Sequence, residues 1–380
     1  MPSCHFSSSK CHINLTALAK NFSLLGKPEY LMPVIKSDAY GHGLLRVADC
    51  LAKAGARRFA VGYVDEGRLL REQGHNNEVI LPLLPPIRDE EWQTARNYSL
   101  TALVTSFEML ERAGSMGSKD NPMPIAIKFE TGMHRLGFRQ ESLPLLIDKL
   151  KGMPTVKPTI CVSHCSCADM PEKQSQTTDQ ICLFSDMAAT LLAAFPDIDR
   201  SLFNSAGTLE TNFRCNICDV ARPGYVLYGG NPFAGTSQEY LGSQLQWVMS
   251  LSAKVAQVTE LRKGEAVSYG QTYTAAQDMR LAVVEIGYAN GVPRRLSNKL
   301  EALLHGKRIH QVGRVCMNLM MFDVTDLPET KAGDTVWLWG GEADEGVKPV
   351  TPQEWADQLD TIAYELLCIV GTMNARTYMV

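Results

Sequence analysis

Eight short apolar runs alternate with amphipathic stretches between residues 30 and 228, and this regularity constrains the fold more than any other feature of the sequence. The runs are 31–35, 59–64, 79–84, 100–105, 124–129, 159–163, 201–204 and 219–222. Strand and helix that alternate eight times over about 200 residues are typical of a closed, TIM-like (β/α)8 barrel rather than of an open doubly wound sheet. No glycine-rich fingerprint of a dinucleotide-binding fold opens the first helix.

Helical periodicity separates the apolar runs. Between the first two runs, Leu44, Val47, Ala48 and Leu51 recur at the spacing of one helix face, and Gly55 follows where a left-handed helix end is expected. Residues 177–195 have a comparable pattern. The sequence therefore predicts helices between successive strands.

After about residue 231 the pattern changes to consecutive strand-like segments with short turns. These are 247–258, 281–286, 308–316, 319–324 and 335–339. Near the end, Thr351 is a candidate N-cap and Pro352 a candidate first residue of a helix that we expect to reach about residue 367. Because 380 residues exceed the usual size of one core, we predict an α/β protein of two domains, with the barrel over residues 1–235 and a mostly β domain over residues 236–380.

Composition excludes several classes of partner. The 37 basic and 41 acidic residues nearly cancel, and no long run of either sign would follow a phosphate backbone or an anionic membrane. No stretch approaches the roughly 18 apolar residues of a membrane span, and no apolar core of a signal peptide follows the N-terminus. We therefore expect a cytoplasmic protein that binds neither nucleic acid nor membrane.

The eleven cysteines are odd in number and scattered, which favours free thiols over disulfides. Two groups have some resemblance to metal ligands, namely Cys161, His164, Cys165 and Cys167, and the pair Cys215 and Cys218. Only one group has the C-x-x-C spacing of a structural zinc site, so buried thiols are the favoured interpretation and we predict no metal.

Polar side chains follow the predicted barrel strands, where such barrels carry their reactive groups. Lys36 ends the first run, Arg135 lies shortly after the fifth, and His164 ends the sixth. The seventh and eighth runs lead into Ser205, Gly207 and Gly224, whose hydroxyl and accessible backbone N–H groups suit a phosphate. The pattern therefore indicates a phosphorylated cofactor.

Lys36 is the most informative single residue. It follows Pro33-Val34-Ile35 at the edge of the core, where partial desolvation lowers the pKa of an amine and frees it to form an imine. The alternative is an ordinary lysine whose aliphatic stem covers the core. The residues that follow Lys36 favour the imine.

Eight segments match the motifs of one family and follow in that family's order. They are IKSDAYGHG, FETGMHRLGF, SHCSCAD, FNSAGTL, ARPGYVLYG, VSYGQTYTA, IGYANG and VGRVCMN. These segments resemble motifs of the alanine racemase family, whose members use pyridoxal 5'-phosphate, and IKSDAYGHG resembles the family's cofactor-lysine motif VKANAYGHG. The resemblance spans residues 35–320 and implies a pyridoxal-phosphate-dependent racemase, with alanine as its first substrate.

The resemblance also implies a role for each matching residue. Lys36 would hold the cofactor as an imine and act as one base, and Tyr269 would be the opposite base, entering from the partner subunit of a homodimer. For the cofactor, the implied roles are these: Tyr40, Ser205, Gly224 and Tyr225 bind the phosphate; Arg222 faces the pyridine nitrogen, with His164 behind it; Asn204 and Thr372 line the pocket; and Arg135 reaches the phenolic oxygen. For the substrate, Arg135 and the backbone N–H of Met317 bind the carboxylate, and Tyr288, Arg294, Arg314 and Asn318 form the entryway. At the position of Lys128, many members carry a carbamylated lysine.

The chemistry agrees with these roles. Moving an α-proton from one face of a substrate to the other suits two bases on opposite sides. Lysine and tyrosine ordinarily titrate near pH 10, so both bases need lowered pKa values. Arg222 does not give up its proton, so the cofactor ring would stay largely unprotonated, which limits transamination.

Four positions depart from the usual family pattern. Asn290 and Asn318 stand where aspartates are usual, Tyr225 replaces an aliphatic residue, and Thr372 replaces a tyrosine that narrows the pocket. A larger, more polar pocket leaves serine, lysine or a broader range as alternative substrates. An amino acid decarboxylase of the same fold and a non-catalytic pyridoxal-phosphate carrier are further alternatives. Arg222 argues against the decarboxylase, and a second domain argues against the carrier.

Overall fold

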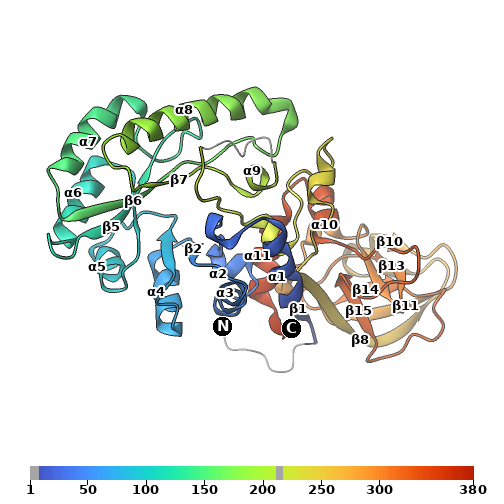
Figure 1. Ribbon diagram of the computed structural model, residues 1–380. Coiled ribbons are helices and arrows are strands. Elements are labelled where there is room, and N and C mark those ends of the chain that lie inside the picture. Colours follow the sequence, from blue (N-terminus) through green and yellow to red (C-terminus); the bar gives the residue numbers. More distant parts are fainter. Residues whose placement is uncertain (1–7, 211–216) are drawn as a thin grey trace. The chain divides into compact units, whose positions relative to one another are not determined.

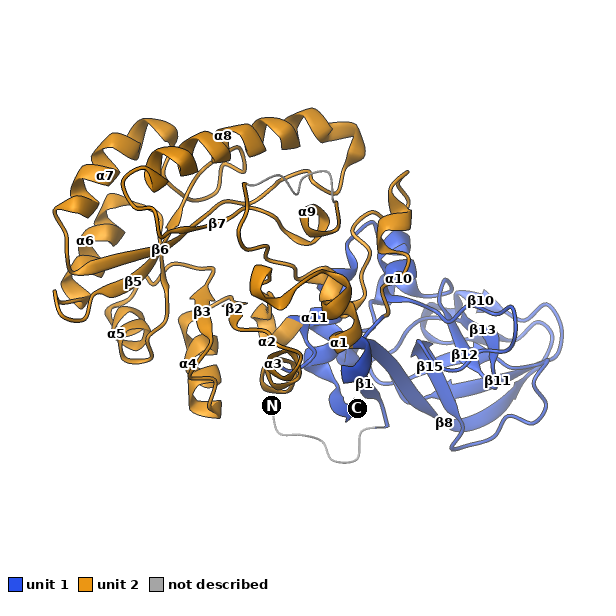
Figure 2. Ribbon diagram, in the orientation of Figure 1, with its two compact units in different colours: residues 1–17, 40–43, 247–380 blue, residues 18–39, 44–246 orange. Residues whose placement is uncertain are grey.

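The computed structural model describes residues 8–210 and 217–380, and it divides the chain into two compact units (Figure 2). The barrel unit comprises residues 18–39 and 44–246. The β-rich unit comprises residues 1–17, 40–43 and 247–380. The N-terminal segment and the four residues 40–43 therefore belong to the same unit as the C-terminal part of the chain.

Six strands of the barrel unit overlap the second to seventh predicted runs, β7 by one residue only, and are parallel (Figure 1). They are β2 (Arg58–Val61), β3 (Val79–Pro82), β4 (Ala102–Val104), β5 (Met123–Lys128), β6 (Val156–Val162) and β7 (Asp199–Ser201). The first and last predicted runs form single bridges, Val34 with Ala60 and Leu31 with Ala221. Strands buried on both faces need continuous apolar sequence, and residues 59–61 are fully buried.

Backbone hydrogen bonds close these strands into a ring. The Thr101 N–H donates to Ile80 O at 2.9 Å, which joins β3 to β4. The Asp219 N–H donates to Arg200 O at 2.8 Å, and the Ala221 N–H donates to Tyr30 O at 2.8 Å. The predicted (β/α)8 barrel is therefore confirmed.

Helices lie on the outside of the barrel strands (Figure 1). They are α3 (Leu44–Lys53), α4 (Val64–Gln73), α5 (Asp89–Asn97), α6 (Phe107–Met116), α7 (Leu143–Lys151), α8 (Gln174–Leu192) and α9 (Ser205–Leu209), with α1 (Leu15–Leu24) preceding the first strand. The buried face of α3 consists of Leu44, Val47, Ala48 and Leu51, as their spacing predicts. Gly55 has a φ of 104°, so the left-handed position after α3 is also confirmed.

The β-rich unit contains a sheet with the order β11-β14-β13-β12-β15-β8-β1-β16, and β11 also pairs with β8. Its strands are β1 (Lys10–Asn14), β8 (Met249–Leu261), β11 (Met279–Val284), β12 (Glu301–Leu304), β13 (Lys307–Val312), β14 (Met320–Asp323), β15 (Thr335–Trp339) and β16 (Ala375–Met379), with the short pair β9 (Ala266–Val267) and β10 (Tyr273–Thr274) beside it. The five predicted segments correspond to β8, β11, β13, β14 and β15. Sequence patterns did not identify β1, β12 and β16.

The predicted C-terminal helix begins as expected but is not continuous. Thr351 Oγ1 accepts from the Glu354 N–H at 3.3 Å, and Glu354 Oε1 accepts from the Thr351 N–H at 3.1 Å, which completes a capping box. The helix α10 (Pro352–Leu359) then ends at Asp360, whose φ is 56°, and α11 (Ala363–Met373) follows. The prediction of one helix to residue 367 is therefore wrong, because a short polar side chain allows Asp360 to take the left-handed conformation.

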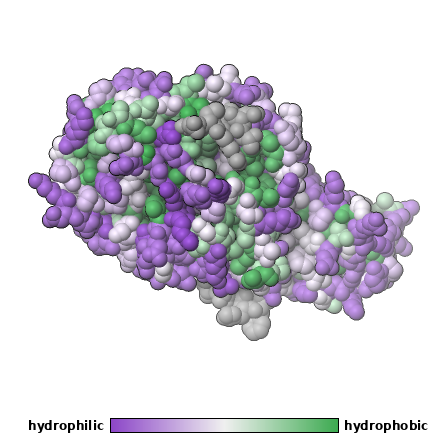
Figure 3. Space-filling model, viewed as in Figure 1, coloured by the Kyte–Doolittle hydropathy of each residue, from purple (hydrophilic) through white to green (hydrophobic). Residues whose placement is uncertain are grey.

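Short 3-10 helices occupy many of the connections between these elements. They are Pro28–Tyr30, Gln140–Ser142, Pro171–Lys173, Tyr225–Tyr228, Glu239–Gly242, Tyr269–Gln271, Tyr288–Asn290 and Arg294–Leu296. Hydrophilic side chains are spread over the face of the molecule shown in Figure 3, as expected for helices whose apolar side packs on strands. Across residues 8–210 and 217–380, no helix combines the length and apolar character needed to span a membrane.

Removal of the Thr351 hydroxyl should destabilise the β-rich unit. We expect Thr351→Ala to lower the free energy of unfolding by about 1 kcal/mol, because the Glu354 N–H loses its side-chain acceptor. Urea unfolding followed by circular dichroism measures this change. Thr351→Ser keeps the hydroxyl, and an equal loss in that variant would show that the cap is not the cause.

Candidate functional site

The segment after Lys36 has an unusual backbone. Ser37, Asp38, Ala39 and Tyr40 have φ values of 55°, 53°, 55° and 55°, so they form one turn of left-handed helix within α2 (Lys36–Tyr40). For residues other than glycine this conformation costs roughly 1–2 kcal/mol each. Such strain persists only where the surroundings hold it, which marks the turn as a functional candidate.

Two carboxylates hold the first part of this turn. Asp38 Oδ1 accepts from the Leu44 N–H at 2.7 Å, at the start of α3. The Asp38 N–H in turn donates to Glu66 Oε1 at 3.1 Å, from α4. Lys36 is thus followed by a backbone that is fixed from two neighbouring helices.

Arg222 is buried inside the barrel and is bound by neutral groups. Its guanidinium donates to Ser201 Oγ and to the backbone oxygen of Ser163. Ser201 Oγ donates its own proton to Val220 O, so it can only accept from Arg222. Burial lowers the pKa of Arg222, but an arginine remains protonated in a protein.

Four cations surround His164. Burial is the largest cause and Arg222, Lys128, Arg135 and Lys36 follow in that order; together they lower the pKa of this imidazole to about 3. A histidine with so low a pKa is neutral at physiological pH. The predicted residues Lys36, Arg135, His164 and Arg222 therefore lie in one electropositive region of the barrel.

Lys128 and Glu130 belong to the same region. Burial, followed by Arg222, lowers the pKa of Lys128 to about 7. Burial alone would raise the pKa of Glu130, but backbone N–H groups, including that of Arg135 at 3.1 Å, lower it on balance. Glu130 thus fixes the loop that carries Arg135, whose own side chain is exposed.

The loops after the seventh and eighth strands, which carry the residues predicted to bind a phosphate, contact each other. Ser205 Oγ accepts from the Gly224 N–H at 3.0 Å. Asn204 caps α9 by accepting from the Gly207 N–H at 3.2 Å and donates to Cys165 O at 3.3 Å. The buried Tyr225 begins a 3-10 helix directly after Gly224.

These residues fit pyridoxal phosphate by their charge and donors. The phosphate and the phenolic oxygen of this cofactor are anionic, and the barrel region contains several cations that are buried or partly buried. Among the described residues, the Arg222 guanidinium donates to a hydroxyl and to a carbonyl and pairs with no carboxylate. A negatively charged ligand would therefore balance the buried positive charge.

In the β-rich unit, the loops that carry the other predicted residues are neighbours. Ser268, which precedes Tyr269, donates its hydroxyl to Arg314 O at 2.9 Å. The Tyr288 N–H donates to Cys316 O at 3.0 Å, next to Met317. Tyr269 and Met317 are 69% and 55% exposed, so both remain accessible in the single chain.

The remaining predicted residues of this unit are more dispersed. Tyr40 is buried with its ring 6.0 Å from that of Tyr364, and burial raises its pKa. Tyr364 and Thr372 both belong to α11, and the Thr372 hydroxyl donates to Cys368 O at 2.7 Å. Asn318 is an exposed loop residue, and the exposed Arg294 begins a short 3-10 helix.

The thiols form no metal site among the described residues, where no group of three or more potential ligands was found. Cys161 and Cys165 are buried, and burial raises the pKa of each thiol to about 12. Such thiols are unreactive. Cys215 lies outside the described residues.

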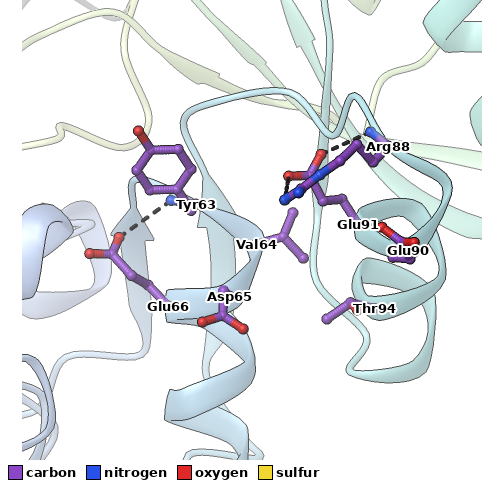
Figure 4. Close-up of a pocket in the computed structure, with 8 residues that line it drawn as sticks. All are labelled: Tyr63, Val64, Asp65, Glu66, Arg88, Glu90, Glu91 and Thr94. Atoms are coloured by element: carbon purple, nitrogen blue, oxygen red, sulfur yellow. Dashed lines mark hydrogen bonds and ion pairs between the residues drawn. The ribbon is translucent and has the colours of Figure 1, made fainter.

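A cavity of about 460 Å³ lies where α4 and α5 begin (Figure 4). Its lining is largely charged and consists of Tyr63, Val64, Asp65, Glu66, Arg88, Glu90, Glu91 and Thr94. Glu66 and Glu91 each point back to the loop that precedes their own helix.

Sequence patterns missed Ser201, Glu66 and Glu130, although all three support predicted residues. Glu130 ends the fifth apolar run, so a charge at a strand end is a usable signal. Ser201 and Glu66 contact residues that are distant in the sequence, and only the fold reveals those contacts.

Two family models match the chain. The model described as the N-terminal domain of alanine racemase matches residues 13–232, and the model of the C-terminal domain matches residues 248–378. An alanine racemase of Nitratidesulfovibrio vulgaris (strain DSM 19637 / Miyazaki F) is 42% identical over 371 residues and 96% of each chain. One of Lawsonia intracellularis is 38% identical over 97% of each chain.

Solved structures give the same result. The biosynthetic alanine racemase of Pseudomonas aeruginosa has a TM-score of 0.84 at 32% identity, covering 99% of this chain and 100% of that one. The alanine racemase of Bartonella henselae, solved with covalently bound pyridoxal phosphate, has a TM-score of 0.85 at 27% identity, covering 98% and 100%.

The lowered pKa of Lys128 predicts a pH-dependent stability in the cofactor-free protein. Above about pH 7 the folded protein holds this amine neutral, whereas the unfolded chain keeps its proton to about pH 10. The unfolded state then binds more protons, so the free energy of unfolding should rise with pH by up to about 1.4 kcal/mol per unit between these limits. Lys128→Met should lack this contribution.

Denaturant unfolding at pH 6, 7, 8 and 9 measures the difference between the wild type and Lys128→Met. The same substitution at the exposed Lys53 is the control. Parallel curves for the wild type and Lys128→Met would contradict the prediction.

Proposed function

The chain belongs to the alanine racemase family, and we propose that it interconverts L-alanine and D-alanine with pyridoxal 5'-phosphate as cofactor and with Lys36 and Tyr269 as its two bases. In this assignment the barrel over residues 1–235 binds the cofactor, and residues 236–380 supply the second base. The observation that carries it is the cluster of cations beside Lys36, in which Arg222 has neutral partners.

Lys36 binds the cofactor covalently, and the groups around it control its protons. When bound, pyridoxal phosphate supplies the electron sink for the charge left at the α-carbon. Arg222 retains its proton against a pyridine nitrogen, and the hydroxyl of Ser201 keeps it in place. His164 is neutral, because burial and the cations lower its pKa.

Racemisation needs one base on each face of the substrate. Lys36 removes or returns the α-proton on one face, and Tyr269 does so on the other, so that either enantiomer is the substrate. Arg135 and the Met317 N–H hold the carboxylate and thus fix which face meets which base. Ser205, Gly224, Tyr225 and Tyr40 hold the phosphate in the same assignment, with Asn204 near the ring.

We further propose that Tyr269 acts in the site of a partner subunit, which makes the protein a homodimer with shared sites. Tyr269 is exposed, and so are Met317 and Leu319 nearby. Exposed apolar side chains that gather on one loop cluster favour an interface. Tyr288, Arg294, Arg314 and Asn318 would form the entryway there.

The other activities with the same fold are less well supported. A decarboxylase of this type places a carboxylate at the pyridine nitrogen, where this chain has Arg222. A protein that only carries the cofactor needs no second base, and therefore would not need Tyr269. Thr372 leaves serine and lysine as additional substrates, since no aromatic ring fills its position.

Replacing each base should have a different effect. Lys36→Ala should abolish the absorbance of the bound cofactor, because no amine remains to bind it. Tyr269→Phe should keep that absorbance and block exchange of the α-proton from one alanine enantiomer only. The absorbance spectrum reports the bound cofactor, and proton exchange in heavy water, followed by chiral analysis, reports the loss of the α-proton from each enantiomer. Wild-type racemisation in Tyr269→Phe would refute the assignment of two bases.

Mixing the two inactive variants tests the shared site. A mixed dimer of Lys36→Ala and Tyr269→Phe contains one site with both bases intact, so unfolding and refolding the variants together should restore about a quarter of wild-type activity. Each variant refolded alone is the control. No recovery in a mixture that forms mixed dimers would exclude exchange of Tyr269 between subunits.

A further inference from the structure

The helices α4 and α5 begin with the same capping arrangement. In each, the third residue is a glutamate that accepts backbone N–H groups from the preceding loop. Glu66 Oε2 accepts from Gly62 at 2.6 Å, and Glu91 Oε2 accepts from Arg88 at 2.9 Å. Both side chains line the cavity of Figure 4. The two glutamates therefore contribute alike to the start of their helices.

The second oxygen distinguishes the two residues. Glu91 Oε1 accepts from the Arg88 guanidinium at 2.9 Å, an exposed contact within its own loop. Glu66 Oε1 instead accepts from the Asp38 N–H at 3.1 Å, two residues after Lys36. Only Glu66 thus joins its helix to the left-handed turn.

The loop that Glu66 caps also lies against Lys36. A Cβ built on Gly62 would lie 3.3 Å from Lys36 Cβ and 3.1 Å from Glu66 Oε2. The root of the lysine side chain and the turn that follows it therefore contact the same capped loop. A strained turn of this kind keeps its geometry only while its hydrogen bonds are made.

We propose that Glu66 is a positioning residue for Lys36, whose carboxylate holds the left-handed turn and so directs the lysine amine toward the cofactor. This inference rests on the proposed role of Lys36 as the cofactor lysine. Both oxygens of Glu66 accept from N–H donors, so a glutamine there would turn its NH2 group toward one of them. Glutamine therefore cannot replace Glu66 without leaving a donor unpaired.

Glu91→Gln is the matched control. One amide oxygen can still accept both loop N–H groups, and only the exposed pair with Arg88 is lost, which is worth little. Comparison of Glu66→Gln with Glu91→Gln thus separates helix capping from the positioning of Lys36.

The experiment uses the full chain and pyridoxal phosphate. Titration of the absorbance band gives the cofactor Kd and the pH midpoint of the band, and thermal unfolding and alanine kinetics complete the comparison. We expect Glu66→Gln to raise the cofactor Kd about tenfold or more, to shift the pH midpoint and to lower kcat more than it changes KM. Its Tm should fall below that of Glu91→Gln, because the Asp38 N–H loses its acceptor, so the pH midpoint and the separate effects on kcat and KM are the readouts that test positioning.

Equal Kd, pH midpoint and kcat in Glu66→Gln and Glu91→Gln would overturn the proposal. Glu66→Asp is the second variant if Glu66→Gln does not fold. Its shorter carboxylate cannot reach both donors, so wild-type cofactor binding in Glu66→Asp would also overturn it, whereas weakened binding would support it.

Borohydride reduction and peptide mapping of the wild type separate this inference from the proposed function. If Lys36 is unmodified, the cofactor lysine is wrongly assigned and the role of Glu66 falls with it. If Lys36 is modified and the glutamine variants behave alike, only the role of Glu66 is wrong.

Discussion

The backbone hydrogen bonds that join the first strand segment of the barrel to the last are the constraint on which the site depends. The Ala221 N–H donates to Tyr30 O, and the Val34 N–H donates to Pro223 O, each at 2.8 Å. These bonds make the segment before Lys36 a neighbour of the segment that carries Arg222. Residues almost 190 positions apart in the chain thereby end at one rim, where a barrel brings its functional groups together.

Closure of the ring also concentrates positive charge. Burial first, and the neighbouring basic side chains second, lower the pKa of Lys128 to about 7 and that of His164 to about 3. Keeping such cations out of water is costly unless an anion accompanies them. Cofactor binding and folding stability are therefore coupled in this barrel, because a ligand that binds only the folded state stabilises it.

The sequence predicted the features that depend on local pattern or on short motifs. The eight apolar runs gave the barrel, the spacing from Leu44 to Leu51 gave the buried face of α3, and Thr351 gave the cap of α10. Strands β1 and β16 mix polar with apolar residues, so no apolar run marks them in the sequence. The break at Asp360 was missed because aspartate adopts the left-handed conformation without the glycine that usually announces it.

The residues of the candidate site that were predicted also follow from local sequence pattern. Lys36, Arg222 and the loops with Ser205 and Gly224 stand at strand ends, which the alternation locates. Ser201 and Glu66 are ordinary polar residues in the sequence, and their importance comes from partners more than 20 positions away. Contacts of that kind follow from the fold and not from local spacing.

The left-handed turn after Lys36 restricts which sequences can occupy positions 37–40. Branching at Cβ is poorly compatible with positive φ, and proline cannot adopt it at all. Valine, isoleucine, threonine and proline are therefore disfavoured there on torsional grounds, whatever their chemistry. A sequence motif taken from positions 37–40 therefore reflects the backbone conformation as well as the chemistry of the side chains. A chain with other functional groups could match such a motif because it has the same left-handed turn.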